Sequence, residues 1–155
     1  YATVDGFDGN DPPFRRGNAG GMLIIADLTG TVATGSWKSR TKFTSVTDGL
    51  SSTIMIGEKH VRPANFGNES SYGDGPMLGS YAYSMMRVAG SSWPLAKGPD
   101  DTVAGQEIAV FGSAHTGVVN FVWGDGSVRG LKPGLDTTTL ARLASRDGGT
   151  VPGDH

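Results

Sequence analysis

The chain has 155 residues and a formal net charge of −2, so its overall charge gives no argument for binding to nucleic acid or to an anionic membrane surface. It contains no cysteine, which excludes disulfides, a thiol nucleophile and a cysteine-based zinc site. Its 25 glycines and 8 prolines favour short strands and long ordered loops over helices, within a single domain over residues 1–155.

The first 21 residues show no helical or strand periodicity. Four oxygen-bearing side chains crowd among glycines here, and they form a candidate calcium site because oxygen ligands on a loop suit Ca²⁺: Asp5, Asp8, Asn10 and Asp11. The alternative is a solvated loop, since the same residue types are favoured in turns. The chain opens at Tyr1 without methionine, and we expect it to be a piece of a longer protein whose missing N-terminal segment carries the targeting information.

The segment 22–27, MLIIAD, is a short apolar run and predicts a buried strand. A Gly/Thr/Ser-rich stretch follows, in which Trp37 stands among the basic residues Lys38, Arg40 and Lys42. Aromatic and basic residues together can mark a ligand contact, whereas a single tryptophan more often packs locally. We therefore expect a packing role for Trp37 and keep ligand binding as the alternative.

The segment 43–60, FTSVTDGLSSTIMIGEKH, predicts two elements. Phe43, Val46 and Leu50 recur at helical spacing and Gly49 acts as a stop, so a single helical turn is expected over 43–48. Residues 53–58 then predict a buried strand ending in Glu58, with charged groups at the rim of the sheet and a Glu–Lys surface pair.

The segment 61–108 is rich in glycine and proline and predicts long irregular loops. Within it, alternating Tyr81, Tyr83 and Met85 predict a strand over 80–88. The adjacent pair Asp100-Asp101 is a second candidate calcium site.

The segment 111–131, FGSAHTGVVNFVWGDGSVRGL, carries the strongest local signal in the chain. β-Branched and aromatic residues on either side of Asp125-Gly126 predict a β-hairpin over 118–131, because an Asp-Gly turn accommodates positive φ. Residues 137–146 then predict a helix with Asp136 as its N-cap and an end at Gly148-Gly149. The expected fold is therefore α+β: an antiparallel sheet with long loops and a short C-terminal helix.

The best polar constellation consists of Glu58, His115 and Asp125, each at the end of a predicted strand. A strand between His115 and Asp125 would hold the two at opposite ends, which argues against a catalytic dyad. We expect Asp125 to serve the turn, and His115 to be buried or half-buried and bonded to backbone or to Glu58. Metal ligation and catalysis remain as alternatives for these three residues.

Two sequence blocks point to a known family. His115, nine further residues and Asp125-Gly126 form an H-x9-D-G motif. Upstream, a D-G-x-S-x-T-x-x-x-G-E pattern is made by Asp48, Gly49, Ser51, Thr53, Gly57 and Glu58. Together the blocks resemble the prepilin-type processing-associated H-X9-DG family of bacterial pseudopilin- and type IV pilin-like proteins, with a DUF1559-type C-terminal domain and residues 111–146 as the C-terminal block.

The resemblance implies a structural protein and not an enzyme. It implies a pilin- or pseudopilin-like globular head without its N-terminal helix, exported to the cell surface or periplasm, as in type II secretion or type IV pili. The implied partners are copies of itself or other pilin-like subunits, with no nucleic acid and with membrane contact only through the missing helix. Pseudopilin heads of this group can hold calcium in a loop.

Two other readings stay open. An extracellular carbohydrate- or ligand-binding module would use the loop aromatics Trp37, Trp93 or Tyr72. A metal-dependent hydrolase would be built on Glu58, His115 and Asp125.

Overall fold

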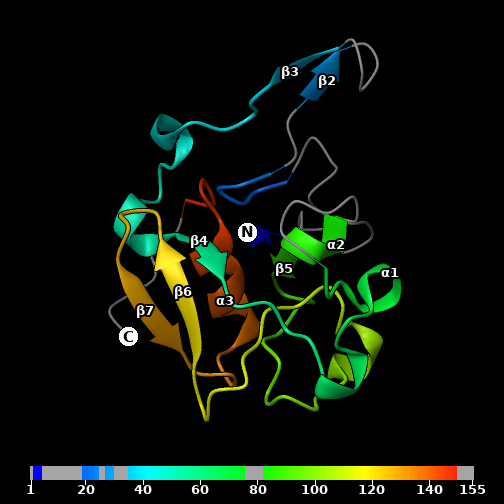
Figure 1. The fold of residues 1–155 in the computed structure, drawn as a ribbon. Helices are drawn as coiled ribbons and strands as arrows, with labels where there is room; N and C mark the ends of the chain where they lie inside the picture. Colours follow the sequence, from blue (N-terminus) through cyan, green and yellow to red (C-terminus); the bar gives the residue numbers. More distant parts are fainter. Residues whose placement is uncertain (1, 5–18, 25–26, 30–34, 76–81, 150–155) are drawn as a thin grey trace.

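The computed structural model describes residues 2–4, 19–24, 27–29, 35–75 and 82–149, which form an α+β fold as expected (Figure 1). A three-stranded antiparallel sheet, short helices and long loops make up this part of the chain. No helix within these described ranges is long and apolar enough to cross a membrane.

The central sheet is built from β4 (Ile54–Gly57), β6 (Val119–Trp123) and β7 (Val128–Leu131), in the order β4-β6-β7. The hairpin predicted over 118–131 is confirmed, since β6 and β7 pair antiparallel. At its turn, the Gly126 amide donates to the Trp123 carbonyl over 2.9 Å, and Gly126 has a φ of +84°. This left-handed backbone explains the glycine that follows Asp125.

The main core lies between this sheet and the C-terminal helix α3 (Thr137–Ala144). Alternate residues of β6 point inward, so Val119, Phe121 and Trp123 are buried, and they pack with Leu140 and Leu143 of α3. In Figure 1, α3 lies behind the sheet, and it also contacts the strand pair β1 (Ala2–Val4) and β5 (Arg87–Ala89).

The helix begins where the sequence predicts and ends earlier. The Asp136 carboxylate accepts the Thr139 amide over 2.9 Å, which confirms the N-cap. Ser145 is already extended, so the helix stops at Ala144 instead of continuing to Gly148. The backbone leaves the helix there because the amides of Gly148 and Gly149 are bound elsewhere, by the carboxylate of Asp48.

Two further strand pairs flank the core. β1 and β5 pair in parallel, and β2 (Asp27–Thr29) pairs antiparallel with β3 (Ser36–Lys38). Figure 1 shows the β2–β3 hairpin standing apart from the central sheet. The buried strand predicted over 22–27 is wrong for residues 22–24, which form a bend and irregular chain. Residues 25–26 lie outside the described part, and Asp27 is the first residue of β2.

The segment predicted as a strand over 80–88 contains a helical turn, α2 (Ala82–Met85), followed by β5. The reason is the buried side chain of Arg87, whose guanidinium donates to the backbone carbonyls of Tyr83 and Met86. A helical turn brings these carbonyls within reach of one side chain, whereas an extended chain would separate them.

The other short elements lie in the loops. Helix α1 (Glu69–Tyr72) is capped by Asn68, whose side chain accepts the Ser71 amide. Short 3₁₀ turns occupy the remaining connections of the described chain: Phe43–Ser45, Leu50–Ser52, Pro63–Asn65 and Val103–Gly105. The helical turn expected over 43–48 is thus shorter than predicted.

Arg87 joins this loop region to the sheet. Besides its own turn it donates to the His60 carbonyl over 3.2 Å, so it links β5 to the chain that leaves β4. Burial lowers the pKa of Arg87 to about 10, because desolvation disfavours the charged guanidinium. The side chain therefore stays protonated at neutral pH, held by carbonyl dipoles.

Gly57 is a packing requirement of the sheet. A Cβ atom at this position would lie 2.4 Å from the Phe121 ring and 2.8 Å from the Phe111 ring. The two rings meet edge to face with centroids 5.2 Å apart, so neither can withdraw without disturbing the other.

We predict that Gly57→Ala lowers the free energy of unfolding by about 1–3 kcal/mol, the usual cost of overpacking a core. Gly98→Ala is the matched control, because a Cβ there meets nothing within 4 Å, and its effect should stay within about 0.5 kcal/mol. Urea unfolding monitored by tryptophan fluorescence measures both. Equal effects of the two substitutions would contradict the packing argument.

Candidate functional site

The carboxylate of Glu58 lies at the point where β4 ends, on the outer side of the sheet. One oxygen accepts the backbone amide of Asn120 over 2.7 Å, and the other lies 3.0 Å from Nε2 of His115. The Glu58 amide donates to the Asn120 carbonyl over 3.2 Å, so backbone and side chain hold the same neighbour. The contact expected between His115 and Glu58 is present.

His115 is not buried, contrary to expectation. Its side chain is 60% exposed, and its backbone amide donates to the Ser113 hydroxyl over 2.9 Å. The turn made by this bond carries His115 outward, so the imidazole reaches Glu58 from the solvent side. An exposed histidine–carboxylate contact of this kind contributes little to stability, at most about 1 kcal/mol.

Asp125 lies at the opposite end of β6. Its carboxylate accepts the Ser127 amide over 2.9 Å and the Ser127 hydroxyl over 2.7 Å, and Arg129 pairs with it at 3.2 Å. These hydrogen bonds from Ser127, with a smaller contribution from Arg129, lower the pKa of Asp125. The Arg129 guanidinium also lies over the Trp123 ring, 4.6 Å from its centroid.

The three predicted site residues are therefore not brought together. Asn120, whose amide binds Glu58, lies near the start of β6, and Asp125 lies in the turn after it. The three extended steps from Asn120 to Trp123 alone span about 10 Å. Metal–ligand distances of about 2–2.5 Å do not allow one ion to bridge that span. No group of three or more histidine and carboxylate side chains suited to a metal occurs within the described residues.

Residues of the upstream motif also form hydrogen bonds with backbone groups. The buried carboxylate of Asp48 accepts the amides of Gly148 and Gly149 over 2.8 and 3.0 Å. The hydroxyl of buried Thr53 donates to the Gly49 carbonyl over 3.0 Å and lies 3.4 Å from the Ser145 carbonyl. Both residues thus tie the chain before β4 to the end of α3, an arrangement that the sequence alone did not indicate.

The residues after Glu58 do not form the predicted Glu–Lys surface pair. Lys59 pairs instead with Asp74 at 3.6 Å, and it also donates to three backbone carbonyls. His60, predicted at the rim, is buried, with Nε2 2.7 Å from the Asp101 carbonyl. The chain turns inward here because Arg87 holds the His60 carbonyl.

The candidate calcium sites fall in two places. Asp5, Asp8, Asn10 and Asp11 lie outside the described residues. Of the second candidate, Asp100 is exposed, and the Asp101 carboxylate caps a loop by accepting the amides of Lys97 and Val103, each over 2.9 Å. These bonds, first that from Lys97, lower the pKa of Asp101.

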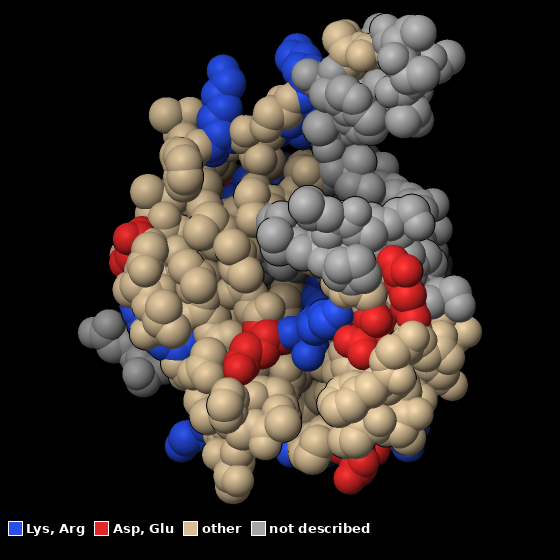
Figure 2. Space-filling view, in the orientation of Figure 1, with Lys and Arg blue, Asp and Glu red and all other residues tan. Residues whose placement is uncertain are grey.

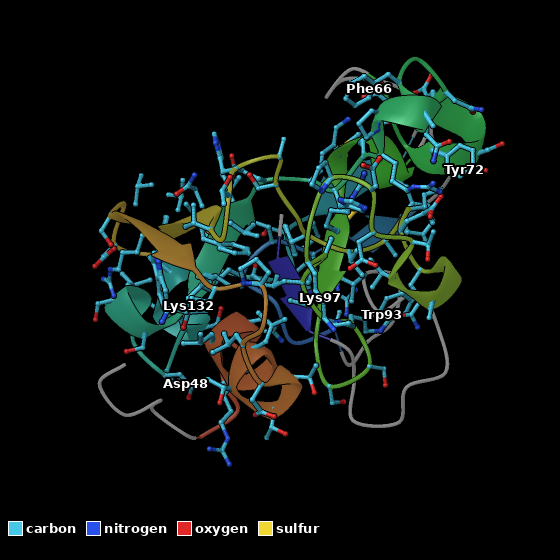
Figure 3. The ribbon with its side chains drawn as sticks, turned by 90° about the horizontal axis from the view of Figure 1, so that it is seen from below. Asp48, Phe66, Tyr72, Trp93, Lys97 and Lys132 are labelled. Carbon is cyan, nitrogen blue, oxygen red and sulfur yellow. The ribbon has the colours of Figure 1, made fainter. Side chains whose placement is uncertain are left out.

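The aromatic candidates are dispersed. The side chain of Trp37 lies outside the described part, although its backbone forms β3. Trp93 is half-buried and packs against two apolar clusters, which is a packing role. Tyr72 is half-buried on α1, and Figure 3 places it with Phe66 at the end of the molecule remote from Asp48.

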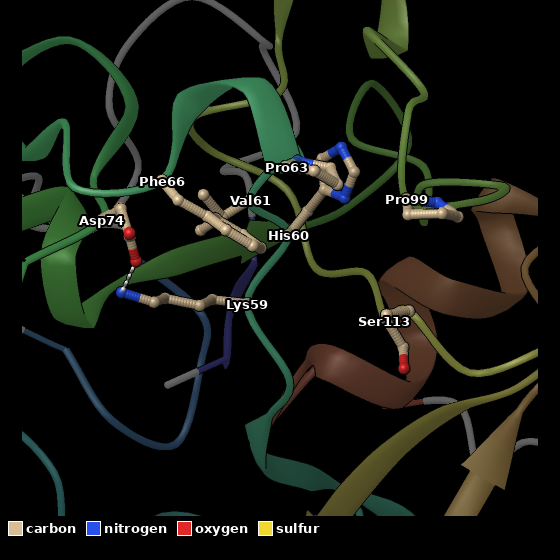
Figure 4. Close-up of a pocket in the computed structure, with 9 residues that line it drawn as sticks. Lys59, His60, Val61, Pro63, Phe66, Asp74, Pro99 and Ser113 are labelled. Carbon is tan, nitrogen blue, oxygen red and sulfur yellow. Dashed lines mark ion pairs between the residues drawn. The ribbon is translucent and has the colours of Figure 1, made fainter.

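Phe66 is the aromatic that the sequence analysis missed. Its ring is 66% exposed and it borders a pocket of about 270 Å³ between the loops after β4 and before β6 (Figure 4). Its sequence context, a loop rich in asparagine and glycine, carries no periodic signal that would distinguish it.

Comparison with known proteins gives one family. The model of the family described as "Protein of unknown function (DUF1559)" matches residues 4–137, which include both motif blocks. The chain belongs to this family. The resemblance read from the two blocks is thereby confirmed at the level of DUF1559. No curated protein and no solved structure matches the chain.

We predict that Glu58→Ala and His115→Ala have unequal effects. Glu58→Ala removes a charged acceptor from the Asn120 amide and should lower the free energy of unfolding by about 1.5–3 kcal/mol. His115→Ala breaks only an exposed pair and should cost less than about 1 kcal/mol. Urea unfolding near neutral pH measures both. A larger loss for His115→Ala would show that the histidine has a role in the fold that this geometry lacks.

We also predict a pH dependence that Asp101 contributes. Its pKa is lower in the folded than in the unfolded chain, where it is about 3.9, so its stabilising effect is complete above that value and is lost as the pH falls through the folded pKa. The stability difference between wild type and Asp101→Asn should therefore shrink as the pH falls from about 6 to about 3. Urea unfolding across this range measures it, and a constant difference would contradict it.

Proposed function

We propose that this DUF1559 protein is a non-enzymatic structural subunit, the exported globular head of a pilin- or pseudopilin-like protein that assembles at the cell surface or in the periplasm. The main support for the proposal is that the residues of the two motif blocks make structural contacts within the fold. Asp48, Thr53 and Glu58 bind backbone groups, Gly57 admits two aromatic rings, and Asp125 shapes a turn. These are structural roles, and they favour a structural function for the protein.

The surface charge supports the same proposal. Figure 2 shows basic and acidic side chains next to one another near the middle of the face displayed, without a broad field of one sign. With a net charge of −2, this pattern favours protein partners over nucleic acid.

The central sheet offers a surface for contact between copies. Within the described chain, β7 pairs only with β6, so one edge of β7 is open. Since bonded pairs alternate along an antiparallel ladder and Trp123 bonds Ser127, the backbone groups of Val128 and Gly130 point to this edge. Open strand edges are templates for pairing with another chain.

An apolar row reaches the same edge. The register aligns Ile56, Val122 and Val128 across the three strands. Ile56 is 41% exposed and Val128 67% exposed on the outer face. A second copy joined at β7 would extend the sheet and cover part of this row, and we take copies of the chain as the partner.

We predict that the protein associates in a concentration-dependent way and that Val128→Glu weakens the association about 10-fold or more, because a charge would be buried at the contact. Phe43→Glu is the matched control, since Phe43 is equally exposed at 67% and lies in a separate 3₁₀ turn. Sedimentation velocity over a concentration series measures both. A protein that stays monomeric throughout, or equal effects of the two variants, would contradict the contact.

The exported location has its own test. Fractionation of cells that produce the full-length protein should place it in the periplasmic or surface fraction. Recovery in the cytoplasmic fraction alone would overturn the proposal whatever the oligomeric state.

A further inference from the structure

The pocket beside Phe66 has apolar walls and few polar groups. In Figure 4, Phe66 and Val61 lie on one side and Pro99 and Ser113 on the other, with the Lys59–Asp74 pair at one end. Its volume is about 270 Å³. Mostly apolar walls with a few placed polar groups are the usual form of a small-molecule site.

The lysine in this pocket is not available to an anion. Its ammonium group donates to the carbonyls of Gly73, Gly75 and Ser84 over 3.0, 3.2 and 3.3 Å. It also pairs with Asp74 at 3.6 Å. The three protons of an ammonium are thus engaged by the protein, and a phosphate or carboxylate would have to displace these contacts. The pocket therefore favours an uncharged ligand.

The remaining polar groups at the rim suit hydroxyls. The Ser113 oxygen accepts the His115 amide, which leaves its hydroxyl hydrogen to donate. Asp74 accepts the Gly67 amide over 2.6 Å with one oxygen, and the lone pairs left on its two oxygens can accept from a ligand. A purely apolar ligand would desolvate these groups without replacing their hydrogen bonds, which is costly.

Phe66 requires an apolar face on the same ligand. Its exposed ring presents a negative π surface, on which weakly polarised C–H groups pack favourably. Proline-rich peptides also bind aromatic grooves, but such grooves are lined by several phenylalanine, tyrosine or tryptophan rings, and Phe66 alone among the described lining residues is of these types. A pyranose ring combines one C–H face with hydroxyls at its edge.

We propose that this pocket binds a single pyranose ring of a neutral sugar, stacked on Phe66 with a hydroxyl bonded to Asp74. The binding site lies away from the β7 edge and is independent of the assembly proposed above. It also moves the carbohydrate-binding hypothesis from the loop aromatics Trp37, Trp93 and Tyr72 to Phe66.

The test is an NMR titration of the protein with four probes: methyl β-glucopyranoside, methyl β-galactopyranoside, methyl α-mannopyranoside and N-acetylglucosamine. Each is added to about 20 mM, because so small a ligand reaches only about millimolar affinity. At least one should shift the amide signals of Phe66, Asp74 and Ser113 in a saturable way. The absence of saturable shifts with all four would overturn the proposal.

Two variants and one comparator locate the site and define its chemistry. Phe66→Ala should weaken binding at least about 10-fold with an otherwise unchanged spectrum, since the ring is exposed, whereas Phe43→Ala, with a ring equally exposed elsewhere, should leave it unchanged. Cyclohexanol has a similar ring with a single hydroxyl. If it binds as tightly as the best glycoside, or if Phe66→Ala binds normally, the sugar site is refuted.

Discussion

The close approach of the backbone at Gly57 to the rings of Phe121 and Phe111 is the constraint on which the rest of the sheet depends. A side chain at position 57 would clash with these rings, so β4 can pair with β6 in this register only with glycine opposite Phe121. This register places the next residue, Glu58, beside Asn120. The Glu58 carboxylate then accepts the Asn120 amide at this end of the sheet. The packing around Gly57 and the position of the Glu58 carboxylate are therefore coupled, and a substitution that displaces β4 would displace the carboxylate as well.

The spacing of the H-x9-D-G motif follows from this geometry. The nine residues between His115 and Asp125 contain a short loop, all of β6 and the first residue of the turn. One motif residue meets Glu58 where the strand begins, and the other shapes the turn where it ends. The nine-residue spacing thus corresponds to the length of β6 and the residues that connect it to His115 and Asp125. Residues at the two ends of a strand do not converge, which explains why the structure separates them and why we propose a structural role for the protein.

The two surfaces that we propose for binding lie outside the motifs. The open edge of β7 and the exposed aliphatic row are products of the sheet, whereas the pocket beside Phe66 is a product of the loops. Two cationic side chains hold these loops: buried Arg87 binds carbonyls of its own turn and of His60, and half-buried Lys59 binds carbonyls before and within α2. Both cations bind backbone carbonyls, and Lys59 also pairs with Asp74.

Sequence patterns were enough to predict the fold class, the hairpin, the start of α3 and the family, because each depends on local spacing: apolar alternation, a turn that needs positive φ, or an N-cap before an apolar stripe. Tertiary structure alone decided the short strand boundaries, the helical turn before Arg87, the exposure of His115 and the pocket beside Phe66. These features depend on contacts that apolar periodicity does not encode. The Arg87 guanidinium binds the nearby carbonyls of Tyr83 and Met86 and the distant carbonyl of His60, the Ser113 hydroxyl turns His115 outward, and the pocket forms where loops far apart in the sequence meet.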